Sequence, residues 1–165
     1  LDMPIVNAIN GVAAGAGMSF ALSGDIILAA KSAYFLQAFG RIGLVPDAGA
    51  TYILPRKIGV ARAMELSLLA EKLPAEKALE WGLINFVHED DELQAAAEEI
   101  AQKFAKGPTQ AYSRIRKLYR DSFENSFEEQ IIHERLYQRE CGVTDDFKEG
   151  VTAFLQKRPA EFKGK

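Results

Sequence analysis

Two short stretches of the sequence carry residue types that could act on a carbonyl compound. In the first, Gly15-Ala16-Gly17 follows the apolar, β-branched run Pro4–Ile9 and precedes an apolar segment that begins at Met18. A strand that leads through such a turn into a helix leaves backbone N–H groups without partners at the positive end of the helix dipole. In the second stretch, Asp47 follows Pro46 and precedes another glycine-rich turn. N–H donors for an oxyanion and a nearby carboxylate are the groups needed to move a proton next to a carbonyl.

Each stretch also has a purely structural interpretation. The glycine-rich turn would let the following helix lie close to a sheet, because glycine has no Cβ. Asp47 would serve as a helix N-cap, with its side chain accepting hydrogen bonds from the N–H groups that follow, and Gly59 would end that helix. The residue pattern alone leaves both interpretations open.

The elements that must position these residues are a small sheet and several short helices. The pattern predicts strands in four apolar runs: Pro4–Ile9, Ile26–Ala30, Ala33–Leu36 and Leu83–Val87. It predicts a turn at Gly11–Gly17 and helices at Met18–Ser23, Asp47–Gly59, Val60–Leu69 and Ala75–Trp81. A strand, a helix and a second strand at this spacing indicate a right-handed crossover and a parallel sheet.

The rest of the chain is predicted to be helical. Apolar residues at steps of three and four mark one helix at Leu93–Phe104 and another at Ala111–Ser122. Ser126 and Glu129 have the spacing of a capping box and open a third helix, and a fourth follows Thr144. The Lys-, Pro- and Gly-rich tail from Lys157 is predicted to be a mobile end.

Composition narrows the class of protein. The net charge is −3 and no basic cluster stands out, so nucleic acid and anionic membranes are not expected partners. Cys141 is the single cysteine among 165 residues, which excludes an internal disulfide and fits a reducing, cytoplasmic setting. No apolar run approaches the ~20 residues of a membrane span. No His, Cys, Asp or Glu residues have the spacing of metal ligands, so no metal site is expected.

Longer motifs carry a resemblance to a known family. The stretches Asn10–Ser19 and Ala38–Asp47 resemble those of the crotonase (enoyl-CoA hydratase/isomerase) superfamily. Within it, Ala38–Asp47, Glu149–Leu155 and Phe162–Lys165 are most similar to the ring-1,2-epoxyphenylacetyl-CoA isomerases of phenylacetate breakdown. The resemblance extends over nearly the whole chain.

The resemblance implies an α/β fold. Residues 1–88 are expected to form part of the family's ββα spiral, and residues 89–165 a C-terminal helical region that assembles a homotrimer or a dimer of trimers. The first third of the family fold has no counterpart before Leu1. We therefore expect a preceding segment to complete the sheet and to supply one of the two oxyanion donors. The 165 residues alone are not expected to be a competent enzyme.

The resemblance also assigns roles to the two stretches. The N–H of Ala16 corresponds to the second oxyanion donor, and Asp47 to the carboxylate base of ring-epoxide and dienoyl-CoA isomerases. The two glutamates of hydratases correspond to Ser19 and Phe39, which carry no carboxylate and argue against Glu-dependent hydration. Apolar neighbours such as Phe39, Leu44 and Val45 are expected to raise the pKa of Asp47.

The remaining implied contacts concern the substrate, an acyl-CoA thioester, with no separate cofactor. Ala14, Gly15, Phe39 and Leu44 are expected to line its site. Phe162 and Lys163 are expected either to cover the CoA adenine and phosphates or to form a solvated basic tail.

Other functions stay open at this point. The main alternative to an isomerase is a catalytically silent crotonase-like module that binds acyl-CoA or only assembles. Enoyl-CoA hydratase is a weaker candidate. An aryl-CoA dehalogenase with Asp47 as nucleophile is another, although such enzymes carry a Trp where Phe39 stands.

Overall fold

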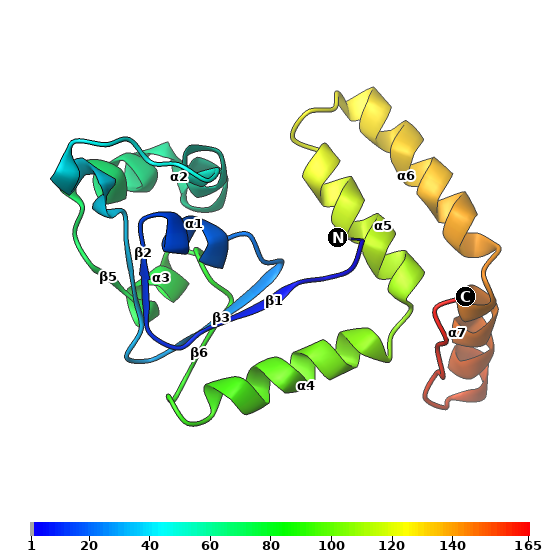
Figure 1. The fold of residues 1–165 in the computed structure, drawn as a ribbon. Coiled ribbons are helices and arrows are strands. Elements are labelled where there is room, and N and C mark those ends of the chain that lie inside the picture. Colours follow the sequence, from blue (N-terminus) through cyan, green and yellow to red (C-terminus); the bar gives the residue numbers. More distant parts are fainter. Residues whose placement is uncertain (1) are drawn as a thin grey trace. The chain divides into compact units, whose positions relative to one another are not determined.

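The computed structural model describes residues 2–165 and divides the chain into two compact units (Figure 1). The core unit spans residues 5–99. The helical unit consists of residues 100–165 together with the segment that ends at Pro4. The division of the sequence at residue 88 into a spiral core and an oligomerisation region stays a prediction.

Two small sheets form the frame of the core unit. The first sheet is parallel, in the order β1 (Val6–Ile9), β3 (Ile26–Ala30) and β6 (Phe86–His88). The second sheet has the order β2 (Val12–Ala14), β4 (Tyr34–Leu36) and β5 (Leu73–Pro74). In it, β2 and β4 are parallel, and β5 is antiparallel to β4. The chain therefore passes from the first sheet to the second twice, through β1–β2 and β3–β4.

A helical segment follows each of these strand pairs, which gives the expected ββα pattern. The helical segments of the core unit are α1 (Ala16–Ala21), the 3-10 helix η1 (Ala38–Ile42), α2 (Ala50–Leu69) and α3 (Ala75–Glu80). In α2, Gly59 has φ 76° and ψ 160°, which are not helical angles. This kink lies at the residue where the sequence predicts one helix to end and the next to begin.

The core lies around β3 and the elements that flank it. Ile27, Leu28, Ala29 and Ala30 are each at most 1% exposed, so β3 is buried on both faces. An apolar run without alternation is typical of a strand in the middle of a parallel sheet. Other fully buried side chains come from α1 and the residue that follows it, from β4 and from α2: Met18, Leu22, Phe35 and Leu54.

The predicted strands are confirmed, with β3 at its predicted bounds and β1 and β4 somewhat shorter than predicted. The last strand, β6, lies slightly further along the chain than predicted. The prediction of an uninterrupted turn over Gly11–Gly17 is wrong, because Val12–Ala14 pairs with β4. Three residues between glycines are too short to show a strand pattern, and their partner strand comes later in the sequence.

The helical unit is built on the predicted amphipathic helices. Its elements are the end of α4 (Leu93–Ala105), α5 (Thr109–Asp121), α6 (Phe127–Gly142) and α7 (Asp145–Gln156). The predicted capping box is confirmed, since Ser126 Oγ accepts from Glu129 N and the Glu129 carboxylate accepts from Ser126 N. Thr144 caps α7 by accepting from Phe147 N. None of the helices within residues 2–165 combines the length and apolar composition that a membrane crossing requires.

The C-terminal tail folds back along α7. Lys157, at φ 55°, ends the helix, and Arg158 N donates to Ala153 O at 3.1 Å. The Arg158 guanidinium then donates to both carboxylate oxygens of Glu149, at 2.6 and 2.9 Å. Glu161 N also donates to Glu149, at 2.9 Å. The tail predicted to be a mobile end is therefore hydrogen-bonded to the helix that precedes it.

Candidate active site

The glycine-rich turn has the backbone conformation that a small residue allows. Gly15 has φ 53° and ψ −130°, a region that residues with a Cβ rarely occupy. Its N–H donates to Leu36 O at 2.9 Å, and its carbonyl accepts from Met18 N and Ser19 N. Within residues 2–165, the N–H groups of Ala16 and Gly17 have no acceptor. The predicted oxyanion donor, Ala16, therefore has its hydrogen available, and Ala14 immediately precedes this turn at the end of β2.

The 3-10 helix after β4 brings Phe39 to the same turn. A Cβ placed on Gly15 would lie 3.6 Å from Phe39 Cζ, so the ring packs beside the glycine. The segment then closes on itself, since Leu44 N donates to Phe39 O at 3.0 Å and Gly43 adopts φ 72°. Arg41 donates to Ala70 O and ties this segment to the end of α2.

Asp47 lies in a turn whose main chain is hydrogen-bonded to α1. Its carbonyl oxygen accepts from Ser19 Oγ at 3.0 Å and from Ala50 N at 3.0 Å. The two residues that follow have left-handed backbones, Ala48 at φ 48° and Gly49 at φ 84°. The Asp47 carboxylate is exposed and makes no hydrogen bond or ion pair with residues 2–165.

Two expectations about Asp47 are corrected by this geometry. Its side chain does not cap α2, because the residue before that helix is Gly49 and no side-chain capping bond is made. The apolar cover expected from its neighbours is also absent in this segment, since Leu44 is 59% and Val45 78% exposed. The structural interpretation of Asp47 as an N-cap is therefore wrong, and so is the expected burial by Leu44 and Val45.

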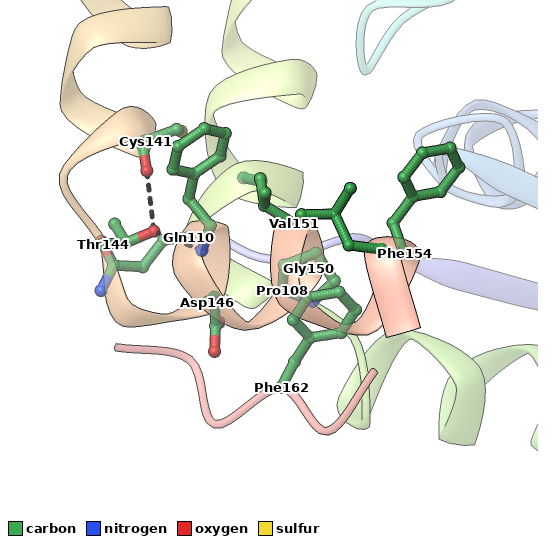
Figure 2. A pocket seen from close by; sticks show the side chains of 12 residues that line it. Pro108, Gln110, Cys141, Thr144, Asp146, Gly150, Val151, Phe154 and Phe162 are labelled. Carbon is green, nitrogen blue, oxygen red and sulfur yellow. Dashed lines mark hydrogen bonds between the residues drawn. The ribbon is translucent and has the colours of Figure 1, made fainter. Parts of the chain in front are cut away.

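Phe162 and Lys163 belong to the helical unit, on the tail that runs back along α7. Asp146 is 5% exposed, and its carboxylate accepts from Lys163 N at 2.7 Å and Gly164 N at 2.9 Å. Figure 2 shows the ring of Phe162 beside Gly150, where an added Cβ would lie 3.5 Å from the ring. The ring forms part of the wall of a cavity of about 400 Å³ between α5, α7 and the tail, whose other walls include apolar side chains of α7.

The structure thus gathers six of the eight predicted site residues in one part of the core unit. Gly15 and Ala16 begin α1, Phe39 packs on Gly15, and Ser19 connects α1 to the Asp47 turn; Ala14 and Leu44 adjoin these residues in the chain. Phe162 and Lys163 lie in the other unit. The resemblance alone assigns Ser19 only the place of a missing carboxylate. A polar residue inside an otherwise apolar helix is the signal that its side chain has a partner.

A second polar residue that sequence reasoning missed is Gln37. It is fully buried, and its Nε2 lies 3.5 Å from Met18 Sδ, next to α1. Its Oε1 is buried without a hydrogen-bond partner among residues 2–165. Within the same residues, no group of three or more His, Cys, Asp or Glu side chains is arranged to hold a metal ion.

Comparison with known proteins identifies the family of this chain. The sequence model of the enoyl-CoA hydratase/isomerase family matches residues 1–165. The chain is 47% identical over 165 residues to 1,2-epoxyphenylacetyl-CoA isomerase of Escherichia coli (strain K12), covering 63% of that protein. It is 45% identical over 163 residues to a Rhodobacter capsulatus protein named "probable enoyl-CoA hydratase", again covering 63% of it.

A solved structure agrees with the sequence relatives. The crystal structure of enoyl-CoA hydratase from Bacillus anthracis superposes with a TM-score of 0.96 at 33% identity, covering the whole of this chain and 64% of that one. The chain therefore spans somewhat less than two thirds of the length of the relatives it matches. Its ββα core, glycine-rich turn and C-terminal helices all have counterparts in one family, and the chain belongs to the enoyl-CoA hydratase/isomerase family.

Proposed function

We propose that the protein is an acyl-CoA isomerase in which Asp47 moves a proton between two carbons of a CoA thioester. The thioester oxygen would accept a hydrogen bond from the N–H of Ala16. Removal of a proton from the carbon next to the carbonyl places negative charge on that oxygen, where the donor stabilises it. Return of the same proton from Asp47 to a different carbon gives the isomer. The step needs no cofactor, metal ion or second substrate.

One observation carries this proposal. The two positions that resemble the glutamates of hydratases hold Ser19, whose hydroxyl donates to Asp47 O, and Phe39, whose ring packs on Gly15. Neither side chain can deliver or remove the proton of a water molecule near neutral pH. Asp47, whose main-chain oxygen accepts from Ser19, would supply the carboxylate, and a single carboxylate suits proton transfer within one substrate.

The similarity to the E. coli isomerase supports the same reaction type and favours 1,2-epoxyphenylacetyl-CoA as a substrate. For substrate binding we propose that Ala14, Gly15, Phe39 and Leu44 contact the acyl thioester. Phe162 and Lys163 would contact the nucleotide part of CoA. We further propose a cytoplasmic homotrimer or dimer of trimers.

A second candidate is a silent module that binds acyl-CoA without converting it. The observation that favours it is the exposure of Asp47 and its neighbours Leu44 and Val45, because a catalytic carboxylate is normally shielded from water when substrate is bound. Binding of acyl-CoA without any turnover by the native, full-length protein would support this second candidate.

The substitution Asp47→Asn tests the proposal in the full-length protein. Asparagine keeps the size and loses the ability to take up a proton, so the isomerisation rate should fall about 10²- to 10⁴-fold. Affinity for the acyl-CoA, measured by calorimetry, should stay within about threefold, because the amide removes no contact that holds the turn. Asp91→Asn is the matched control, since Asp91 is also exposed and makes no ion pair with residues 2–165. Undiminished turnover by Asp47→Asn would show that the base lies elsewhere.

A further inference from the structure

The hydroxyl of Ser19 donates its hydrogen bond to an acceptor that is unusual for a serine within a helix. Ser19 lies inside α1 and is 1% exposed. A serine within a helix commonly donates to the carbonyl four residues earlier, which here is Gly15 O. That distance is 3.5 Å, whereas Asp47 O lies 3.0 Å away. Because a hydroxyl has one proton to donate, the shorter bond to Asp47 is the one that Ser19 makes.

The turn that receives this bond depends on such support. Ala48 adopts φ 48°, a left-handed conformation that costs free energy in a residue with a Cβ. Gly49 continues at φ 84°, so the chain reverses sharply directly after Asp47. The carbonyl of Asp47 accepts both Ser19 Oγ and Ala50 N, and these two bonds fix the peptide from which the carboxylate projects.

The other end of α1 is fixed as well. Gly15 N donates to Leu36 O at 2.9 Å, which ties the start of the helix to β4. Ser19 follows Gly15 by one helical turn, so a single short helix connects the free N–H of Ala16 to the backbone of Asp47. Within residues 2–165, the Asp47 side chain itself makes no bond that could orient it. The main chain of Asp47 therefore fixes the place and direction of its Cα–Cβ bond, from which the carboxylate extends.

We infer that Ser19 is a positioning residue for the proton transfer. Its buried hydroxyl holds the main chain of Asp47 at a fixed place relative to α1, so that the carboxylate stays aligned with a carbonyl bound at Ala16. This inference rests on the proposed function and deepens it. Ser19 does not contact substrate; it acts through Asp47. A misplacement of about 1 Å can lower the rate roughly 10²-fold. Removal of the Ser19 hydroxyl should therefore lower kcat and leave substrate binding unchanged.

The test compares three Ser19 variants of the full-length protein with 1,2-epoxyphenylacetyl-CoA as the probe. Ser19→Ala removes the hydroxyl and should lower kcat about 10- to 100-fold with KM within about threefold. Ser19→Thr keeps a hydroxyl and should recover kcat to within about threefold of the native value. Ser19→Cys fills the same space with a weak donor and should behave like Ser19→Ala. It replaces that variant if the alanine protein does not fold.

Two further variants make the result decisive. Ser23→Ala removes a hydroxyl that donates to Phe20 O, just after the same helix, and should leave kcat unchanged. Asp47→Asn in the same series tests the proposed function. If Asp47→Asn is inactive while Ser19→Ala and Ser19→Cys turn over at the native rate, the inference about Ser19 is wrong and the proposed function stands. If Asp47→Asn is active, the proposed function fails first. A loss in which KM rises and kcat does not fall would also overturn the positioning role.

Discussion

At the scale of single residues, Ser19 and Phe39 decide which reaction is open to the site. Hydration needs one group to hold and deprotonate a water molecule and another to protonate the substrate carbon. Ser19 is buried and its hydroxyl donates a hydrogen bond to Asp47 O, and the Phe39 ring packs on Gly15. We therefore expect negligible hydration of crotonyl-CoA, measured by loss of the enoyl thioester absorbance. Turnover at ordinary enzyme rates, on the order of 10 s⁻¹ or more, would contradict this.

The double variant Ser19→Glu with Phe39→Glu extends the same prediction. It restores both carboxylates, but the first would occupy a site that is 1% exposed and would lose the hydrogen bond to Asp47 O. An unpaired buried carboxylate is costly, so the melting temperature should fall. We expect at most a trace of hydration. Phe39→Glu alone serves as the control that separates the effect of the new carboxylate from the loss of the Ser19 bond.

At the scale of elements, carboxylates of α7 hold the C-terminal tail against that helix by accepting hydrogen bonds from it. Hydrogen bonds from Arg158, and then from Glu161 N, lower the pKa of Glu149 from 4.5 to about 2. A carboxyl whose pKa is lower in the folded state stabilises that state fully above the unfolded value and loses the contribution as pH falls through the folded value. The interaction of the Glu149 carboxylate with the tail should therefore have its full strength above about pH 4.5 and weaken as the pH falls from about 4.5 to about 2.

Hydrogen exchange at the Glu161 amide measures this directly. In the native protein, protection of that amide should be constant at neutral pH and fall on acidification through this window. Glu149→Gln cannot pair ionically with Arg158, so its protection should be lower at neutral pH and vary less with pH. Glu65→Gln is the control, since Glu65 is exposed and makes no ion pair with residues 2–165. Equal protection in the native and Glu149→Gln proteins would contradict the role of this carboxylate.

The elements that local chemistry determines could be predicted from the sequence. The capping box at Ser126 and the kink at Gly59 depend on a few neighbouring residues, and both are where the pattern indicated. The strand β3 was predictable because a strand buried on both faces needs an unbroken apolar run. Strand β2 could not be predicted, because it forms only by pairing with β4. The ordered tail could not be predicted either, because its N–H groups donate to Asp146 and Glu149, which lie many residues earlier in the sequence.

The candidate site shows the same limit. The glycine-rich turn and Asp47 stand out in the sequence because glycine and a carboxylate after proline are unusual in apolar surroundings. The bond from Ser19 to Asp47 O joins residues that are far apart in the chain, and only the packing of α1 against the turn brings them together. The exposure of Leu44 and Val45 likewise could not be read from their apolar character.

At the scale of the whole molecule, the helical unit leaves an apolar surface without cover. On α6, Ile132 is 54% and Leu136 48% exposed; they are four residues apart and so lie on the same side of the helix, of which no residue is buried. Apolar side chains grouped on one helix mark an interaction surface more often than a solvated one. With a net charge of only −3, repulsion between copies is small. We expect this surface to be covered by a second copy of the chain in the proposed homo-oligomer.

The variant Ile132→Glu tests this expectation in the full-length protein by sedimentation equilibrium. Burial of one isoleucine side chain contributes about 1.5–3 kcal/mol, so its loss should weaken association roughly 10- to 100-fold and shift the mass toward that of the monomer. Gln138→Glu adds the same charge at another exposed position of α6 and should leave the mass unchanged. A native protein that stays monomeric, or an Ile132→Glu protein with native mass, would mean that something other than a second copy covers α6.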